Sequence, residues 1–412
     1  MRRYTAAILL LFSVSIFYNI IHPETQIVGL KMEIIMDVIA FSVGIPIAVY
    51  SIIIIDKIDV PNIILYMILT IWGMLLLNVF RLALQGEVTL VIAARIFTYI
   101  SVGAAMLFVT PYKIRKYIVL ISTARIAVIL SIIGFPAVVW DFIFARGAGG
   151  FTRFSFIQSI PSGSVRVPAL TSVFYNTNQL SFLLLVGLLA AVWEHHRRQS
   201  ILSIVQVILI ALGLYLNHSR GAMLSAAIGL VIIELGRRSI KRRDMAMIIA
   251  CTGVCAGITI LSISIFQASP IVNLTGRMEL WGAAVDAFYR QPVLGYGPRN
   301  TGQVIEPYVS GSRLSGKHPH NAFIRMFLTS GVFGGVSYAL LMWTPNIHGI
   351  QLSDSIDDVI IVGICTSICI NQMFEVYTLF GLRIQALASA LFFGFLIKSL
   401  VRGYSKKLKI SI

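Results

Sequence analysis

Two histidines flank a proline in the segment Lys317-His318-Pro319-His320-Asn321, directly before a long apolar run. Histidine is the usual general base near neutral pH, and nearby cations favour the neutral imidazole that a base needs. Pro319 biases its neighbours towards extended backbone, and Asn321 is a natural N-cap for the helix that the apolar run predicts. We therefore expect an imidazole, His320 first and His318 second, to accept a proton at a helix entrance. The alternative role for the two histidines is to bind zinc, but we find no third zinc-binding residue beside the pair.

Arginines in three other segments are candidates for holding an anion. Arg220 begins an apolar run, and an arginine at membrane depth costs roughly 2.5–3.5 kcal/mol on insertion scales. Arg277 follows the cap candidate Thr275 in the first turn of an amphipathic segment, where the helix dipole favours an anion such as phosphate over a cation. Arg166 precedes the polar stretch 176–178, which opens another apolar run. The alternatives are snorkelling to the interface for Arg220 and ordinary solvated or capping residues for the others.

The elements that must position these residues are membrane helices. Of the 412 residues, 57% are hydrophobic and 12% are charged, whereas a soluble domain has about 25% charged residues. Apolar runs of bilayer-spanning length recur along the chain, and lipid forces such runs into helices. The sequence therefore predicts an all-α polytopic membrane protein, a single integral domain over residues 1–412 with about twelve transmembrane helices. We expect them at residues 5–21, 33–55, 61–82, 89–109, 117–140, 178–194, 201–216, 219–236, 245–266, 322–343, 357–378 and 380–400.

Lysine and arginine gather in every second loop, which with twelve spans places both termini in the cytoplasm. Two longer loops, 141–177 and 267–321, then face the outside, the second of them as a long periplasmic loop that contains a helix. Both have more basic than acidic residues, as an anionic ligand requires. The net charge of +16 does not indicate nucleic acid, because the basic residues form no stripe with interleaved aromatic residues. Asp354, Asp357 and Asp358 cluster in a predicted cytoplasmic loop, and we expect them to be solvated.

The motifs follow one another in a recognisable order. Ser219-Arg220-Gly221-Ala222 is followed by Gly276-Arg277-Met278-Glu279-Leu280-Trp281, Pro292-Val293-Leu294-Gly295-Tyr296-Gly297, His318-Pro319-His320-Asn321-Ala322-Phe323 and Ser330-Gly331. In this order the chain resembles the O-antigen ligase and O-antigen polymerase superfamily of bacterial membrane glycosyltransferases, over residues 166–340. Phe174-Tyr175-Asn176-Thr177-Asn178 matches a looser family pattern, in which a proline is expected at position 177.

The resemblance implies a polyprenyl (undecaprenyl) diphosphate-linked glycan as donor and a lipid-linked or glycan acceptor, at the periplasmic face of the bacterial inner membrane. It implies that Arg220 and Arg277, with Arg166 as a further contact, hold the diphosphate. His320 would deprotonate the acceptor hydroxyl, supported by His318, Asn321 and Glu279. It implies no cofactor and no metal, and the remaining partners are membrane lipids.

Three functions remain open from the sequence. The His-x-His-Asn form favours a ligase, whose acceptor is the core oligosaccharide of lipid A. The alternative is a polymerase of O-antigen or exopolysaccharide, which joins lipid-linked repeat units. A lipid-glycan flippase or transporter is the alternative of another class. A flippase would place charges deep in several spans around a central cavity. Here Arg95 and Arg125 lie deep in predicted spans, but the better candidates for binding and proton transfer gather at the predicted outer ends of spans.

Overall fold

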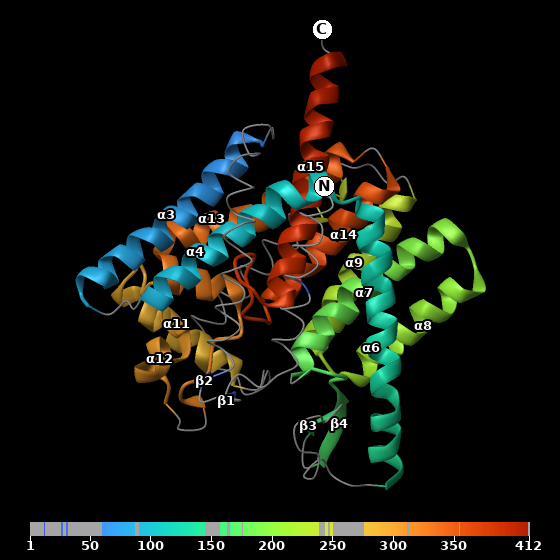
Figure 1. Cartoon of the computed structure of the whole chain (residues 1–412), viewed down its shortest axis with the longest axis horizontal. Coiled ribbons are helices and arrows are strands. Elements are labelled where there is room, and N and C mark those ends of the chain that lie inside the picture. The colour runs from blue at the N-terminus through green and yellow to red at the C-terminus, as the bar shows by residue number, and fades with distance from the viewer. Residues whose placement is uncertain are drawn as a thin grey trace.

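A computed structural model of the chain describes residues 12, 26–27, 30–31, 60–86, 90–144, 157–162, 165–174, 176–238, 244–245, 248–249, 276–310, 314–353 and 355–410. Helices dominate this part of the chain (Figure 1). They are α3 (Asn62–Leu84), α4 (Leu90–Ala104), the π-helical η1 (Ala105–Val109), α5 (Thr110–Lys113), α6 (Lys116–Phe144), α7 (Thr177–Arg198), α8 (Ile201–Leu216), α9 (Arg220–Arg237), α11 (Arg277–Arg290), α12 (Thr301–Ile305), the 3-10 helix η2 (Glu306–Tyr308), α13 (Ala322–Leu352), α14 (Ile356–Gln372) and α15 (Ile384–Ile410). Two antiparallel pairs, β1 (Gln26–Ile27) with β2 (Leu30–Lys31) and β3 (Ile157–Ser162) with β4 (Val165–Leu170), are the strands described.

The predicted spans between 61 and 236 and those after 321 fall on helices of this structure. They correspond, in chain order, to α3, α4 continued by η1, α6, α7, α8, α9, α13, α14 and α15. The predicted spans at 5–21, 33–55 and 245–266 lie largely outside the described residues. Among the described helices, six are long and apolar enough to cross a membrane. The helical, polytopic character is therefore confirmed, and the number twelve stays a prediction.

The start of α7 illustrates how the sequence sets a helix boundary. The Asn176 side chain caps α7, because its Oδ1 accepts a hydrogen bond from the Asn178 N–H at 2.8 Å. Thr177 is the first helical residue, the position at which a proline is most readily accepted. The departure from the looser family pattern at Thr177 therefore leaves the helix start intact. From there α7 runs buried between α6, α8, α9 and α14.

A break in α13 at Gly331 is the place where the turn that follows α11 attaches to α13. Gly331 has a φ of +64°, so the helical hydrogen-bond pattern is interrupted there. The carbonyls of Leu328 and Thr329 accept hydrogen bonds from the N–H groups of Tyr296 (2.7 Å) and Gly297 (3.0 Å) instead. In return, the Val332 N–H donates to the Pro292 carbonyl at 2.8 Å. The turn that follows α11 is therefore fastened into α13 by backbone hydrogen bonds.

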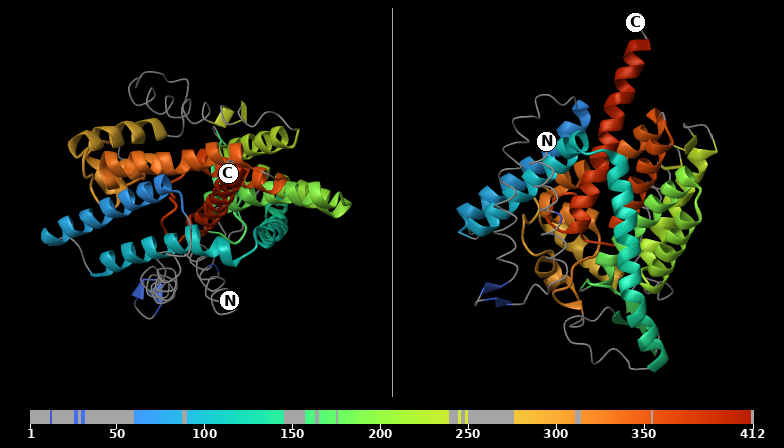
Figure 2. Two further views of the ribbon diagram at one scale, coloured as in Figure 1. Left: turned by 90° about the horizontal axis from the view of Figure 1, so that it is seen from above. Right: turned by 45° about the vertical axis from the view of Figure 1, so that its right-hand side comes forward.

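Two polar residues of α3 hold the same turn from the other side. Asn78 Nδ2 donates to the Leu294 carbonyl at 2.7 Å, and Arg81 Nη2 donates to the Gly295 carbonyl at 2.8 Å. Asn78 is fully buried, which explains why an otherwise apolar helix carries it. Figure 2 shows α3 and α13 running alongside each other, as their packing requires. The helix pair and the turn form one rigid support.

The hairpin of β3 and β4 lies in the first long loop, for which the sequence predicted no element. It pairs Ile157 with Leu170 and Ser162 with Val165 in antiparallel register. Pro161 and Pro168 stand within the strands, and proline in a helix interior removes a hydrogen bond and clashes with the preceding turn. Asn217 Nδ2, at the end of α8, donates to the carbonyls of Leu170 (2.6 Å) and Thr177 (3.0 Å). This contact ties the hairpin to the start of α7 and the end of α8.

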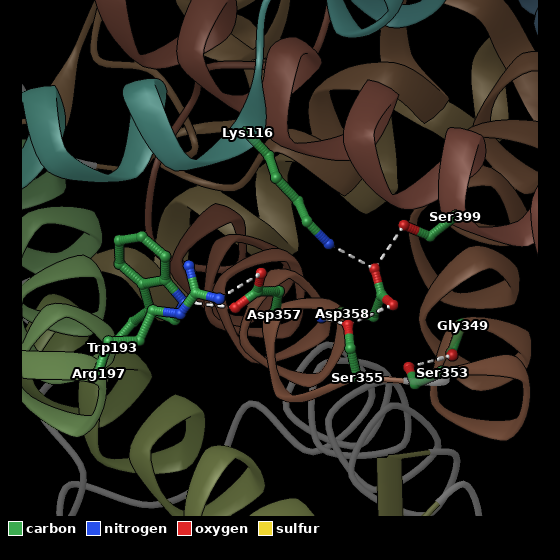
Figure 3. Close-up of polar contacts among 9 residues, drawn as sticks. All are labelled: Lys116, Trp193, Arg197, Gly349, Ser353, Ser355, Asp357, Asp358 and Ser399. Atoms are coloured by element: carbon green, nitrogen blue, oxygen red, sulfur yellow. Dashed lines mark hydrogen bonds and ion pairs between the residues drawn. The ribbon is translucent and has the colours of Figure 1, made fainter.

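A polar cluster joins the helices α6, α7, α14 and α15 (Figure 3). Asp358 at the start of α14 pairs with Lys116 of α6 at 2.8 Å and accepts a hydrogen bond from Ser399 of α15 at 2.9 Å. Asp357 accepts one from Trp193 Nε1 of α7 at 2.8 Å. The expectation that Asp357 and Asp358 are simply solvated is therefore wrong, because both carboxylates join helices that are distant in sequence. Asp354 lies outside the described residues.

We predict that Gly331→Ala destabilises the protein more than Gly86→Ala does. Both glycines have a positive φ, +64° and +72°, and a sparsely populated backbone conformation of this kind costs an alanine about 1–3 kcal/mol. A Cβ at Gly331 would also collide with the Val293 backbone, whereas a Cβ at Gly86 meets nothing within 4 Å. Thermal unfolding of the purified variants in detergent measures the difference. Equal losses in Tm would show that the break at Gly331 is not tightly closed.

Candidate functional site

The His-Pro-His turn before α13 is held at both ends by buried groups. Trp281 of α11 is 3% exposed, and its Nε1 donates to the Pro319 carbonyl at 2.6 Å. Asn321 is fully buried and caps α13, as expected, by accepting from the Ile324 N–H at 3.0 Å. Because α11 and α13 each contribute one of these contacts, the position of the two histidines depends on how the two helices meet.

His320 presents a neutral, partly buried imidazole. Its backbone adopts a left-handed conformation with a φ of +45°. Burial, the Arg277 guanidinium and the Lys317 ammonium lower the pKa of His320 to about 4. Its Nδ1 is buried and has no hydrogen-bond partner among the described residues. A neutral ring with an unused nitrogen is the form that can accept a proton from a ligand.

Arg277 is the first residue of α11, after Gly276 in the left-handed conformation, with a φ of +79°. Its guanidinium lies over the Phe374 ring, 5.8 Å from the centroid. Burial lowers the pKa of Arg277, and the Glu375 carboxyl acts in the opposite direction. Arg277 is therefore not an ordinary solvated loop charge. It and His320, predicted from separate motifs, are brought into one site.

Glu375 is a site residue that the sequence reasoning did not include. It lies in the segment 373–383 between α14 and α15 and is 7% exposed. Burial raises its pKa to about 8, while Arg277, a hydrogen bond with Asn178 and Arg383 lower it. Among the groups that lower the pKa of Glu375, Arg277 has the strongest influence. The signal available in the sequence was a lone acid between two apolar runs.

Arg220 approaches the same segment from a third direction. It is the first residue of α9 and is exposed. A Cβ added to the next residue, Gly221, would lie 2.9 Å from Cβ of Phe374, so the start of α9 packs directly on this phenylalanine. The start of α9 and the Arg277 guanidinium therefore both lie beside Phe374. Within the described part of the chain, no ion pair or side-chain hydrogen bond engages Arg220.

The other predicted residues have different positions. Arg166 lies in β4, opposite Pro161, and its side chain is outside what the structure describes, so its role stays a prediction. Glu279 is exposed and accepts from the Ser310 N–H at 3.0 Å, which orders the segment after η2. His318 lies beside Thr301, with Nδ1 and Oγ1 2.9 Å apart. Burial, Arg325, His320 and Arg383 lower the pKa of His318 to about 4.

These groups suit proton transfer beside a bound anion. The site offers a neutral base, guanidinium groups and a buried acid, at one end of α7, α9 and α13. No group of three histidine, cysteine or acidic residues with the geometry of a metal site occurs in the described ranges.

The comparison with known families covers the segment that carries this site. Residues 205–339 match the family model described as O-antigen ligase. The matched stretch runs from α8 to the middle of α13, and it contains Arg220, Arg277, His318 and His320. No curated protein matches the chain.

We predict that different cations set the pKa values of the two histidines. Removing a positive charge favours the protonated imidazole, so Lys317→Gln should raise the pKa of His320 and leave that of His318 unchanged. Arg383→Gln should raise the pKa of His318 and leave that of His320 unchanged, because Lys317 acts on His320 and Arg383 on His318. Nuclear magnetic resonance of histidine-labelled protein, with His318→Gln and His320→Gln for assignment, measures both values. A His320 that titrates near 6.5 would contradict the geometry.

Proposed function

We propose, on the premise that the chain belongs to the O-antigen ligase superfamily, that it transfers a glycan from undecaprenyl diphosphate to an acceptor hydroxyl. In the first instance the acceptor is the lipid A core oligosaccharide, and the site faces the periplasm. The observation that carries the proposal is His320. Its buried Nδ1 has no partner within the described part of the chain, and burial, together with Arg277 and Lys317, keeps the ring neutral.

The reaction needs a base and a place for a leaving anion. The acceptor hydroxyl gives its proton to the His320 imidazole while its oxygen bonds to the anomeric carbon of the donor sugar. The bond between that carbon and the diphosphate oxygen breaks, and its electron pair leaves on the diphosphate. Arg277 and Arg220 face the charge that develops there, and guanidinium groups suit phosphate oxygens because they can bind in a bidentate manner. The imidazolium then returns its proton to water.

The protonation of Glu375 keeps Arg277 available for the donor. With a pKa raised to about 8, Glu375 is mostly protonated at pH 7 and does not neutralise the guanidinium beside it. Phe374 orients Arg277 through its ring face and excludes water from one side. A cation that is positioned and desolvated in advance attracts a diphosphate more strongly than a solvated one. Metal is not needed for this step, since the arginines supply the positive charge.

The polymerase remains the alternative within the superfamily, because the same base and arginines would serve a lipid-linked acceptor. The flippase or transporter is less well supported. His320, Arg277 and Glu375 lie at the ends of helices, and α7 and α14 end in the cluster of Asp357 and Asp358 on the other side. This arrangement favours chemistry at one membrane face over passage through the bundle.

We predict that substitutions at His320 and Arg277 separate rate from donor binding. His320→Ala should bind the donor normally but turn over about 10²- to 10⁴-fold more slowly, because a general base is lost. Arg277→Ala should weaken donor binding about 10- to 100-fold, the cost of a charge-assisted hydrogen bond. Arg277→Lys should recover part of this, since lysine lacks the guanidinium fork.

Purified protein in liposomes with an undecaprenyl-diphosphate-linked glycan allows both measurements. Arg290→Ala, an exposed arginine at the other end of α11, is the matched control and should behave as the wild type. Near-normal turnover of His320→Ala would remove it as the base, and the role would pass to His318 if His318→Ala alone were inactive. Unchanged donor affinity in both Arg277→Ala and Arg220→Ala would overturn the diphosphate assignment.

A further inference from the structure

Different cations act on the two histidines of the turn. His320 is influenced by Arg277 and Lys317, and His318 by Arg325 and Arg383 as well as by His320. Glu375 is close enough to both sets of cations to be affected by Arg277 and Arg383. The positive charge of the site is therefore divided into two parts, and the donor accounts for one of them.

Arg325 is held in place by the segment between α14 and α15. It lies in the first turn of α13, and its Nη1 donates to the Val376 carbonyl at 3.0 Å. Arg383 closes the same segment, directly before α15, and is exposed. The segment 373–383 thus fixes the Arg325 guanidinium through the Val376 carbonyl, and it contains Arg383 itself.

The charge of this second group is not balanced by a contact with an acid. In the part of the chain that the structure describes, neither Arg325 nor Arg383 forms an ion pair with a carboxylate. The two guanidinium groups are close enough to repel each other, and both disfavour a charged His318. Clustered cations in a partly buried place destabilise the protein unless an anion joins them. A phosphate would relieve this repulsion, and the guanidinium fork suits it.

We propose that Arg325, Arg383 and His318 form a second anion subsite, which binds a phosphate group of the acceptor. The proposal rests on the proposed function and names the acceptor as a phosphorylated molecule. The phosphate has two chemical sources, the phosphorylated sugars of a core oligosaccharide or the diphosphate of a second lipid-linked glycan. In the tautomer in which the Nδ1 of neutral His318 accepts from the Thr301 hydroxyl, the Nε2 carries the proton and donates one hydrogen bond to the phosphate.

This subsite places the acceptor opposite the donor across the His-Pro-His turn. The donor diphosphate lies at Arg277 and Arg220, and the acceptor phosphate lies at Arg325 and Arg383. Buried Glu375 and Pro319 belong to the segments that carry these groups. Holding both reactants by their charged groups would orient the acceptor hydroxyl towards His320 without contacts to every sugar.

The test compares three acceptors with the wild type and single variants. The acceptors are a phosphorylated core oligosaccharide, the same oligosaccharide after phosphatase treatment, and an undecaprenyl-diphosphate-linked repeat unit. Arg383→Gln should raise the KM for a phosphate-bearing acceptor about 10- to 100-fold and leave the donor KM unchanged. Its effect on the dephosphorylated acceptor should be small. Arg325→Gln should act in the same way, and Arg290→Gln is the matched control.

The acceptor whose KM rises in the variants identifies the source of the phosphate. Sensitivity confined to the core oligosaccharide indicates a ligase, and sensitivity confined to the lipid-linked unit indicates a polymerase. Equal use of phosphorylated and dephosphorylated acceptor by the wild type would overturn the subsite while leaving glycan transfer in place. A rise in donor KM in Arg383→Gln, matching that of Arg277→Gln, would assign the residue to the donor site instead and also overturn it.

A binding titration makes the test independent of turnover. The phosphorylated oligosaccharide and the lipid-linked unit are each titrated against the proteins without a second substrate. Weaker binding of either by both Arg383→Gln and Arg325→Gln, but not by Arg290→Gln, supports the subsite. Unchanged binding of both probes contradicts it. If binding follows the expected pattern but the wild type transfers no glycan to any acceptor, the proposed function fails and the subsite stands.

Discussion

The break in α13 at Gly331 is the constraint on which the site depends. A positive φ interrupts the helix in an apolar environment, so the carbonyls of Leu328 and Thr329 need partners from outside the helix. The N–H groups of Tyr296 and Gly297 supply them, which fixes the end of the turn after α11. The orientation of α11 then follows, and its other end carries Arg277 and Trp281. One backbone discontinuity thereby sets where a cation and a turn of two histidines meet.

Electrostatics determine what that arrangement can do. The site gathers arginines beside a buried acid whose pKa is raised and two histidines whose pKa is lowered. Without a ligand, the neutral histidines limit the number of like charges, whereas the protonated Glu375 leaves the guanidinium groups without a countercharge. The site is thus prepared for anions and for one proton transfer. The cluster of Lys116, Asp357 and Asp358 at the other ends of α6, α7 and α14 has its charges paired within the protein, so it serves packing.

The sequence predicted the helices well because bilayer-spanning apolar runs and local caps determine them. The span at 201–216 coincides with α8, and Asn321 caps α13 as expected. His320 and Arg277 could be named as candidates because each stands in a local motif. Glu375, Arg325 and Arg383 were not included, because their significance comes from contacts between segments far apart in the chain. The β3–β4 hairpin was missed for a related reason, since a search for apolar runs does not detect short strands that contain proline.

The central claim is that Arg277 and His320 act on one donor molecule. The most direct measurement is an electron cryo-microscopy structure of the protein in lipid nanodiscs with a non-hydrolysable phosphonate analogue of the undecaprenyl-diphosphate-linked glycan. The account predicts the diphosphate between Arg277 and Arg220 beside Phe374, with the anomeric carbon facing the His320 ring. A diphosphate bound at Arg325 and Arg383 alone, or at the Lys116 end of the helices, with His320 remote from the anomeric carbon, would contradict it.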